Sequence, residues 1–285
     1  MHAWGTTDPR AAIRSAAKVA LEDADIVSSP VELDRVGSFR DVLSVERVYM
    51  RESGRLRPTP RGYVIDVNQA DNPQRQRFSY AHEIGHILIP VFAENPQLRV
   101  DMRTGGYRPA KEEEHLCDVA ASELLMPGYL FEGRAQSVAP SIDGLWSLAD
   151  SFDVSLEATA LRAVGCGVWD CAVMVWEEML KKSETDALRD AGTQSRGAGA
   201  APRPKLRIRL VTASPRFSKH FFPVGKSACE GSLVGQSALN DALMAGPTEL
   251  PTATGPVVFH AESLRMPYSV RGGAKNRVVT VVHPT

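Results

Sequence analysis

The pattern of apolar and polar positions predicts a helix near the start of the chain and a strand further along it. Small and apolar side chains recur at helical spacing in residues 8–24, which indicates an amphipathic helix. Residues 61–69 alternate instead, with Tyr63, Ile65 and Val67 on one side and more polar side chains on the other. A period of two predicts a strand that is buried on one face only.

Two longer helices follow, and each has a recognisable end. Asn72 is a good N-cap and precedes a proline at the first helical position, so a helix should begin there. It should run to Ile89, because Pro90 cannot continue it. A second helix is predicted for residues 111–126 and is stopped by Pro127.

The rest of the chain is predicted to be a helical middle followed by a β-rich end. Residues 145–164 indicate two short helices, the second capped by Ser155. Residues 168–180 are strongly apolar, and their pattern does not separate a strand from a buried helix. Residues 183–204 are rich in Gly, Ala, Pro and Ser, which is typical of a linker, and strand patterns recur in residues 205–285. These features together predict an α+β protein.

Charge and cysteine content restrict the setting of the protein. Residues 201–285 carry 11 Lys and Arg against 4 Asp and Glu, whereas residues 1–200 carry 22 against 30. The basic segment could contact nucleic acid or pair with the acidic remainder of its own chain. Four irregularly spaced cysteines, no apolar run long enough for a membrane and no secretory signal favour a cytoplasmic protein.

The stretch "AHEIGH" carries the clearest chemical signal of the sequence. Side chains four apart project from the same helix face, so His82 and His86 can offer nitrogens to one cation. Glu83 lies too far round the helix to be an equal ligand, but it can reach a water held by that cation. This is the arrangement of zinc peptidases with an H-E-x-x-H motif, in which the glutamate is the general base. Gly85 inside the helix indicates close packing at that point.

The helix predicted for residues 111–126 offers carboxylates for a third ligand. Candidates are Glu112, Glu113, Glu114 and Asp118. If Glu114 is the ligand, Asp118 lies one turn further on the same face and can orient a histidine ring, whereas the other two glutamates have no such partner.

Two neighbours of Glu114 have less specific interpretations. His115 could stabilise an oxyanion, although a solvent-facing position is the simpler interpretation. Cys117 is interpreted as a small buried apolar residue. Tyr80 and Tyr107 are further candidate donors to a transition state near the motif.

The segments "QRQRFSYAHEIGHILI" and "EHLCDVAASELLMP" resemble the paired signature of the ImmA/IrrE family of regulatory metalloproteases, in its IrrE-like branch. Carried over position by position, the resemblance implies His82, His86 and Glu114 as metal ligands and Glu83 as the catalytic acid and base. One departure is Asp118, where the family usually has Asn. The expected contact of Asp118 with a ligand ring is therefore inferred from the chemistry of its carboxylate and not from the resemblance.

The resemblance also implies an organisation and an activity. It implies a minimal zincin-like domain in residues 1–135, a helix-turn-helix-like segment in 136–182 and, after the linker, a GAF-like α+β sensor domain in 205–285. Similar proteins cut a transcriptional repressor of the helix-turn-helix (XRE) type and thereby relieve repression of stress-response or mobile-element genes. A His₂Glu set suits Zn²⁺ and also Mn²⁺.

Two other functions compete with a protease. A DNA-binding regulator would use residues 145–164 with the basic C-terminal segment, but the stretch "SLEATALRAV" offers only Arg162 to DNA. The sequence therefore favours a protease over a protein that binds nucleic acid directly. A scaffold with a structural metal would need a closed, cysteine-rich site, and Cys117 is the single cysteine near the motif.

Overall fold

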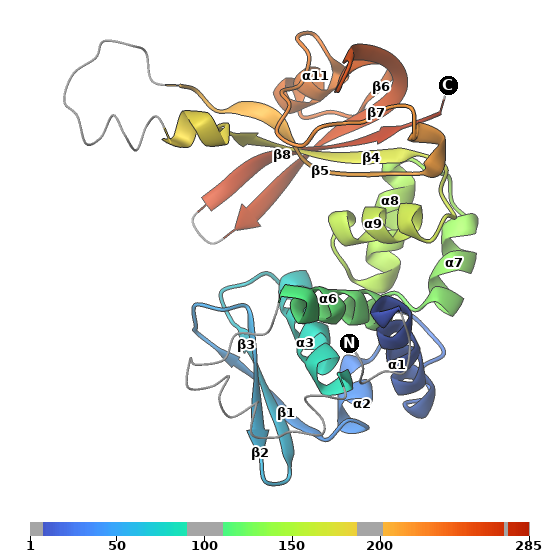
Figure 1. Ribbon diagram of the computed structural model, residues 1–285, viewed down its shortest axis with the longest axis vertical. Coiled ribbons are helices and arrows are strands. Elements are labelled where there is room, and N and C mark those ends of the chain that lie inside the picture. Colours follow the sequence, from blue (N-terminus) through green and yellow to red (C-terminus); the bar gives the residue numbers. More distant parts are fainter. Residues whose placement is uncertain (1–7, 90–110, 187–201, 271–272, 285) are drawn as a thin grey trace, which may run out of the picture. The chain divides into compact units, whose positions relative to one another are not determined.

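The computed structural model describes residues 8–89, 111–186, 202–270 and 273–284 (Figure 1). Helices and two sheets make it an α+β protein, as the sequence predicts. The chain divides into two compact units, one of Met1–Ser137 with Ser147–Arg162 and the other of Val138–Trp146 with Ala163–Thr285. Within the described ranges, no helix is both long enough and apolar enough to cross a membrane.

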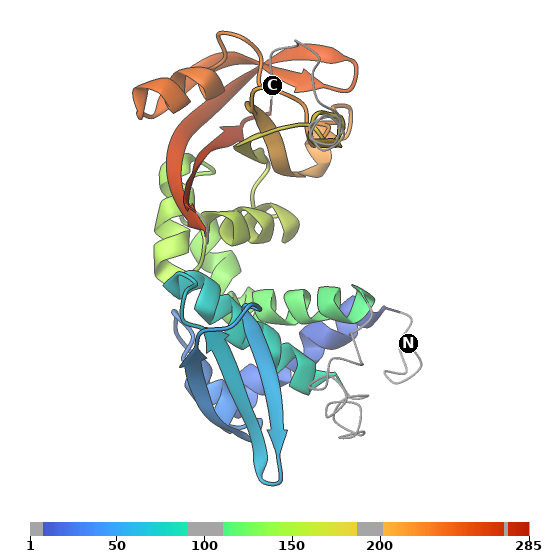
Figure 2. The same ribbon diagram turned by 90° about the vertical axis from the view of Figure 1, so that its left-hand side faces the viewer.

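The first unit combines a small sheet with a group of helices. Its elements are α1 (Pro9–Asp23), α2 (Leu33–Ser38), β1 (Val42–Val48), β2 (Gly54–Thr59), β3 (Gly62–Asn68), α3 (Pro73–Leu88), α6 (Lys111–Leu125) and α7 (Gly128–Gln136). The strand order is β1-β3-β2, with β1 parallel and β2 antiparallel to β3. Helix α3 packs along this sheet (Figure 2) and also against α6.

The predicted helices of the first unit are confirmed to within a few residues. Asp8 caps α1, and the Asn72 side chain accepts a hydrogen bond from Arg75 N–H at the start of α3. Such caps stabilise a helix by about 1 kcal/mol each. The helix α3 ends at Leu88, with Ile89 as its C-cap, and α6 ends just before Pro127. Pro90 and Tyr107 lie outside the described residues.

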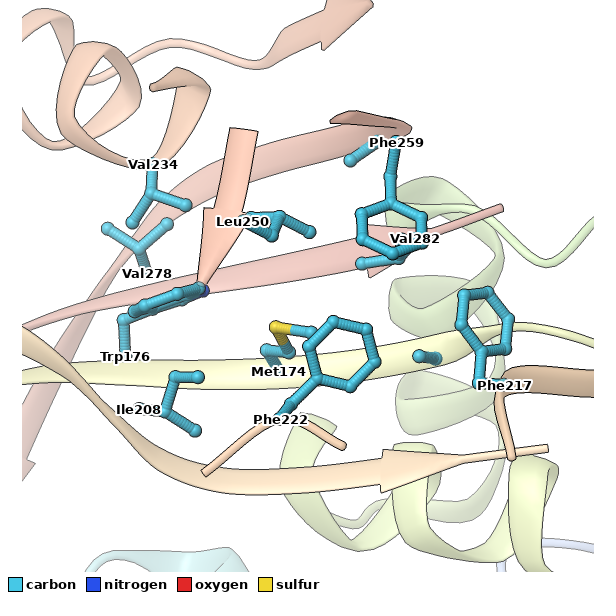
Figure 3. Packing of buried hydrophobic residues seen from close by; sticks show 12 residues of the cluster. Met174, Trp176, Ile208, Phe217, Phe222, Val234, Leu250, Phe259, Val278 and Val282 are labelled. Carbon is cyan, nitrogen blue, oxygen red and sulfur yellow. The ribbon is translucent and has the colours of Figure 1, made fainter. Parts of the chain in front are cut away.

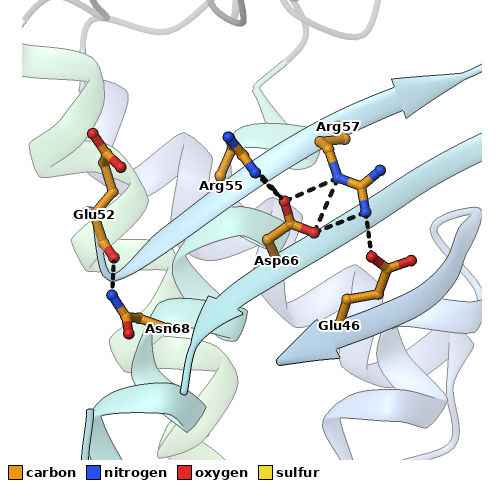
Figure 4. Close-up of polar contacts among 6 residues, drawn as sticks. All are labelled: Glu46, Glu52, Arg55, Arg57, Asp66 and Asn68. Atoms are coloured by element: carbon orange, nitrogen blue, oxygen red, sulfur yellow. Dashed lines mark hydrogen bonds and ion pairs between the residues drawn. The ribbon is translucent and has the colours of Figure 1, made fainter. Parts of the chain in front are cut away.

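The prediction of a strand buried on one face only in residues 61–69 is wrong. Strand β3 is the centre of its sheet, and the successive residues Val64, Ile65, Asp66, Val67 and Asn68 are all buried. Its polar residues are covered by polar partners. Asn68 donates to the backbone carbonyl of Glu52 (Figure 4) and also to that of Met50. Burial by polar groups leaves no apolar signal in the sequence.

Asp66 is covered by two arginines of β2. Arg55 donates to its carboxylate at 2.7 Å and Arg57 at 2.8 Å, and Arg57 also reaches Glu46 at 2.6 Å (Figure 4). Burial opposes ionisation of Asp66, but the two guanidinium groups outweigh it and hold the pKa of this carboxyl below its usual range. The network therefore fixes β2 to the central strand.

Close packing joins α3 to α6. A Cβ atom on Gly85 would lie 3.1 Å from Cα of Cys117 and 3.2 Å from Cβ of Ala120, which is too close for a relaxed contact. The helices can approach this closely because position 85 has no side chain, as the sequence predicts. Residues Ala81 and Ala120 are fully buried at the same contact.

The middle of the chain contains the two predicted short helices, α8 (Ile142–Phe152) and α9 (Leu156–Gly165). Ser155 caps α9, because its hydroxyl accepts a hydrogen bond from Ala158 N–H. Arg162 of α9 pairs with Glu123 of α6 at 2.7 Å and lies over the Phe131 ring. Only 13% of its side chain is exposed.

The second unit is built on a five-stranded sheet in the order β5-β4-β8-β7-β6. Its elements are β4 (Ala172–Met179), β5 (Lys205–Ala213), the 3₁₀ turn Pro215–Phe217, α11 (Leu233–Asn240), β6 (Met244–Thr252), β7 (Gly255–Val270) and β8 (Gly273–Val282). The ambiguous apolar stretch 168–180 thus contains a strand, and this strand pairs with strands that come after residue 204. Most of the predicted linker 183–204 lies outside the described residues.

Apolar side chains from the sheet and α11 meet in one core (Figure 3). Trp176, Phe259 and Leu250 are almost fully buried in it. The indole N–H of Trp176 donates to the Thr280 hydroxyl at 3.0 Å, so its one polar atom has a partner inside the core.

Acidic residues before position 200 pair with the basic C-terminal segment. Arg277 contacts Glu177 at 2.7 Å, Arg207 contacts Glu184 at 3.2 Å, and the two arginines are almost fully buried. Arg216 pairs in the same way with Asp170. Part of the basic excess is therefore neutralised by acidic residues inside the second unit.

Candidate metal centre

The histidines of the H-E-x-x-H motif lie on the side of α3 that faces α6. His82 and His86 are one helical turn apart, with ring centroids separated by 5.1 Å. His86 is 4% exposed, and the side chain of His82 is 15% exposed. The pair is thus fixed by packing on an element whose caps and glycine contact define its position.

Glu114 of α6 faces both rings. Its Oε2 lies 3.3 Å from Nε2 of His82, and its Oε1 lies 3.7 Å from Nε2 of His86. The hydrogen bond with His82 lowers the pKa of the Glu114 carboxyl, which favours the ionised form that a metal ligand needs. Because 47% of the Glu114 side chain is exposed, this side of the group is open to solvent.

The outer ring nitrogens have different partners. Nδ1 of His82 lies 3.0 Å from the Asp118 carboxylate, and Nδ1 of His86 lies 3.3 Å from the Cys117 thiol. Burial lowers the pKa of His82, but Asp118 and Glu114 more than offset it and raise the value to about 9. With both Nδ1 atoms engaged, both Nε2 atoms are directed to one point beside Glu114.

Cys117 is an alternative to Glu114 in the same cluster. Ligand atoms of His82, His86 and Cys117 lie within 4.8 Å of one another. A thiol binds metal as a thiolate, yet burial raises the pKa of Cys117 strongly, and this disfavours ionisation. The carboxylate of Glu114 is already ionised and reaches both rings, so we favour it as the third ligand. Cys117 is fully buried, as predicted, and its contact with His86 was not foreseen.

Glu83 lies under strand β2. It is 7% exposed, and its carboxylate accepts a hydrogen bond from the backbone N–H of Leu56. A Cβ atom on Gly54 would stand 2.6 Å from Oε1 of Glu83, so the strand can approach the carboxylate because this position is glycine. Burial is the largest effect on Glu83, and it raises the pKa to about 7. No spacing in the sequence links β2 to this residue.

The other sequence candidates are placed elsewhere. Glu112 and His115 are exposed on α6, as the simpler interpretation of each predicts. The Tyr80 hydroxyl donates to the carbonyl of Leu33, on a different side of α3 from His82. It therefore does not face the histidine pair.

The donor set fits a divalent cation. Two imidazole nitrogens and a carboxylate oxygen form the protein part of many catalytic zinc sites, which leave one position for water. The buried Glu83 beside such a water has the location and the raised pKa of a proton acceptor. The arrangement can thus support metal-assisted hydrolysis.

Comparison with known proteins finds similar sequences for the part of the chain that carries this centre. The model of the IrrE N-terminal-like domain matches residues 42–164, which include α3 and α6. The matched residues make up less than half of the chain, and they are similar to the corresponding domain of the ImmA/IrrE family.

Two curated relatives carry the name radiation response metalloprotease IrrE. The protein of Deinococcus radiodurans is 36% identical over 107 residues, which are 37% of this chain and 31% of that protein. The protein of Deinococcus deserti is 37% identical over 98 residues, which are 34% of each chain. The match thus spans about a third of the length of these relatives.

A solved structure shows a similar fold. A transcriptional regulator of Mycobacterium tuberculosis aligns with a TM-score of 0.54 over 95% of this chain and 75% of its own. At 14% identity, the likeness concerns the fold alone.

Proposed function

We propose that the protein is a metal-dependent endopeptidase that cuts a specific protein substrate and has its active site in the first unit. The observation that carries the proposal is the Glu114 carboxylate, which faces Nε2 of both His82 and His86 across two packed helices. Following the family resemblance, the substrate is a helix-turn-helix repressor of the XRE type, whose cleavage relieves repression of stress-response or mobile-element genes. The names of the two relatives, which include a radiation response, agree with that role.

In this proposal His82, His86 and Glu114 hold Zn²⁺ or Mn²⁺. A divalent cation held by these residues would supply a polarised scissile carbonyl and a water whose pKa is lowered toward about 7. Glu83 takes a proton from the water and delivers it to the leaving amine. Its raised pKa, about 7, suits both steps near neutral pH. Asp118 and Cys117 orient the two rings through their outer nitrogens.

Strand β3 cannot hold an extended substrate by β-addition. Both edges of β3 are already paired, to β1 and to β2. Strand β2 pairs through one edge within the described residues, and it passes directly over Glu83. We therefore assign the extended substrate to the outer edge of β2, where backbone pairing would bring a peptide bond to the candidate centre.

A cleavage assay tests the catalytic part of the proposal. The repressor encoded beside the gene is co-expressed with the wild-type protein, with Glu83→Gln and with Glu112→Gln as a matched surface control. Glu83→Gln should keep its metal and lose cleavage by about 10²–10⁴-fold, because a general base is removed. Wild-type cleavage by Glu83→Gln would refute the role. Cleavage by His86→Ala that needs no metal would refute the centre.

The helix-turn-helix-like segment and the GAF-like sensor remain parts of the proposal. A DNA-reading role for α9 is disfavoured, because its one arginine, Arg162, is paired with Glu123 and largely buried. We propose instead that α8 and α9 support the peptidase unit or dock the repressor. Salt-dependent binding of the purified protein to duplex DNA would contradict this assignment.

A further inference from the structure

A concave site lies in the first unit on a side of α3 away from the histidine pair. It has a volume of about 600 Å³, within the usual range for small-ligand pockets, and we call it the α2–α3 cavity. Its lining comes from α2, β1, β3 and the first turns of α3, and includes Arg47, Gln76, Arg77 and Tyr80. Tyr80 and His82 are two positions apart and so point to different sides of the helix. The cavity is thus separate from the candidate metal centre.

Arg77 brings a nearly buried cation to this cavity. Its side chain is 18% exposed, and Nη2 donates to the Val31 carbonyl at 2.6 Å. Nε is buried and has no hydrogen-bond partner within the described part of the chain, with the Asp153 carboxylate 3.6 Å away. Burial lowers the pKa of Arg77, the effect expected of a cation that is incompletely compensated.

Arg47 supplies a second guanidinium group from β1. Its Nε donates to Oε1 of Gln76 at 3.3 Å, and the amide of Gln76 is held in turn by the Asp71 carbonyl at 2.7 Å. This contact orients the arginine on the cavity wall and uses one of its five donors. The remaining donors of Arg47 face no acidic side chain within hydrogen-bond distance in the described structure.

The acidic residues of the wall are Glu32, Asp34 and Asp153. Asp153 faces Arg77, and the Asp34 carboxylate lies near the Tyr80 hydroxyl. Three arginines and three acids line the cavity, and because Arg35 is paired to Asp25 outside it, Arg47 and Arg77 are the cations that stand with these acids. Of the two cations, Arg47 has donors without an acidic partner in the described structure, and Val45 and Val67 add apolar surface to the same wall.

We propose that the α2–α3 cavity binds a small organic anion, with a carboxylate or phosphate held by Arg47 and Arg77 and an apolar body against Val45, Val67 and Tyr80. Guanidinium groups are suited to both anions, because their donors match the spacing of paired oxygens. The proposal concerns occupancy of this cavity and does not depend on the peptidase activity.

Ligand titration of the 285-residue chain tests this proposal. The probes are benzoate, phenyl phosphate and the neutral isostere benzamide. Their binding is measured by calorimetry and by changes in the NMR signals of Gln76 and Tyr80. The variant Arg47→Met removes an exposed donor, so its fold should persist. Arg77→Met tests the buried cation, and Arg14→Met on α1 is the control for loss of a surface arginine.

The expected result is saturable binding of at least one anion, with benzamide at least tenfold weaker. Arg47→Met should bind that anion at least tenfold more weakly than Arg14→Met does. The tighter of the two anions identifies a carboxylate or a phosphate as the recognised group. Equal binding of benzoate and benzamide, equal affinities of Arg47→Met and Arg14→Met, or no binding of either anion at millimolar concentration would overturn the proposal.

Discussion

At the scale of single residues, the two candidate ligand rings differ in what holds them. His82 has a charged acceptor, the Asp118 carboxylate, whereas His86 has a buried thiol. Hydrogen bonds to a charged group are about twice as strong as neutral ones, and sulfur is a weak acceptor. His82 should therefore depend on its outer partner more than His86 does.

This difference predicts unequal effects on metal affinity. Asp118→Ala should weaken Zn²⁺ binding by about 10–100-fold, which is typical when the partner of a ligand histidine is removed. Cys117→Ala should weaken it less, since packing of α6 also holds His86. Chelator competition measures both affinities, with the exposed Glu112→Ala as control. A larger loss in Cys117→Ala than in Asp118→Ala would show that the thiol is the more important contact.

At the scale of elements, strand β2 and helix α3 meet at Gly54. Gly54→Ala should separate the strand from Glu83, because the added Cβ would lie 2.6 Å from the carboxylate. We expect cleavage to fall by at least tenfold while metal content stays unchanged, since no ligand moves. Gly133→Ala on α7 meets no atom within 4 Å and is the matched control. Equal cleavage by the two variants would contradict the proposed contact.

The same sheet predicts a response to acid. Because the folded-state pKa of Asp66 lies below its ordinary value of 3.8, its stabilisation is complete above that value and is lost as pH falls through the lowered pKa. Asp66→Asn should reduce the free energy of unfolding by about 1–2 kcal/mol at neutral pH. Denaturant titrations should show this difference shrinking below pH ~4. Asp150→Asn, at an exposed position of α8, should show no such trend.

The sequence predicts elements well where the signal is local. The start of α3 is set by Asn72 with the proline after it, and the motif spacing places both histidines on one face. The burial of β3 could not be predicted, because the covering groups are arginines of β2 rather than apolar residues. The contact between Leu56 and Glu83 is likewise set by tertiary packing alone.

At the scale of the whole molecule, charge is balanced between segments that are distant in the chain. The opposite excesses of residues 1–200 and 201–285 meet partly in pairs such as Glu177 with Arg277. A buried arginine without its partner would be costly, since each ion has lost its hydration. The C-terminal strands and the acidic segment before the predicted linker therefore form one folding unit.

Truncation tests this dependence. A chain ending at residue 182 keeps β4 but removes both of its neighbours, β5 and β8, together with the partners of Glu177. Six of the eight residues of β4 are buried in the untruncated chain. In the shortened chain this strand would therefore expose apolar side chains and two unpaired edges. We expect this chain to aggregate, whereas a chain ending at residue 166, just after α9, should stay monomeric. Size-exclusion chromatography with light scattering distinguishes them. If the chain ending at residue 182 is monomeric and folded, β4 does not need the C-terminal strands. It would then belong to a middle segment that folds independently of them.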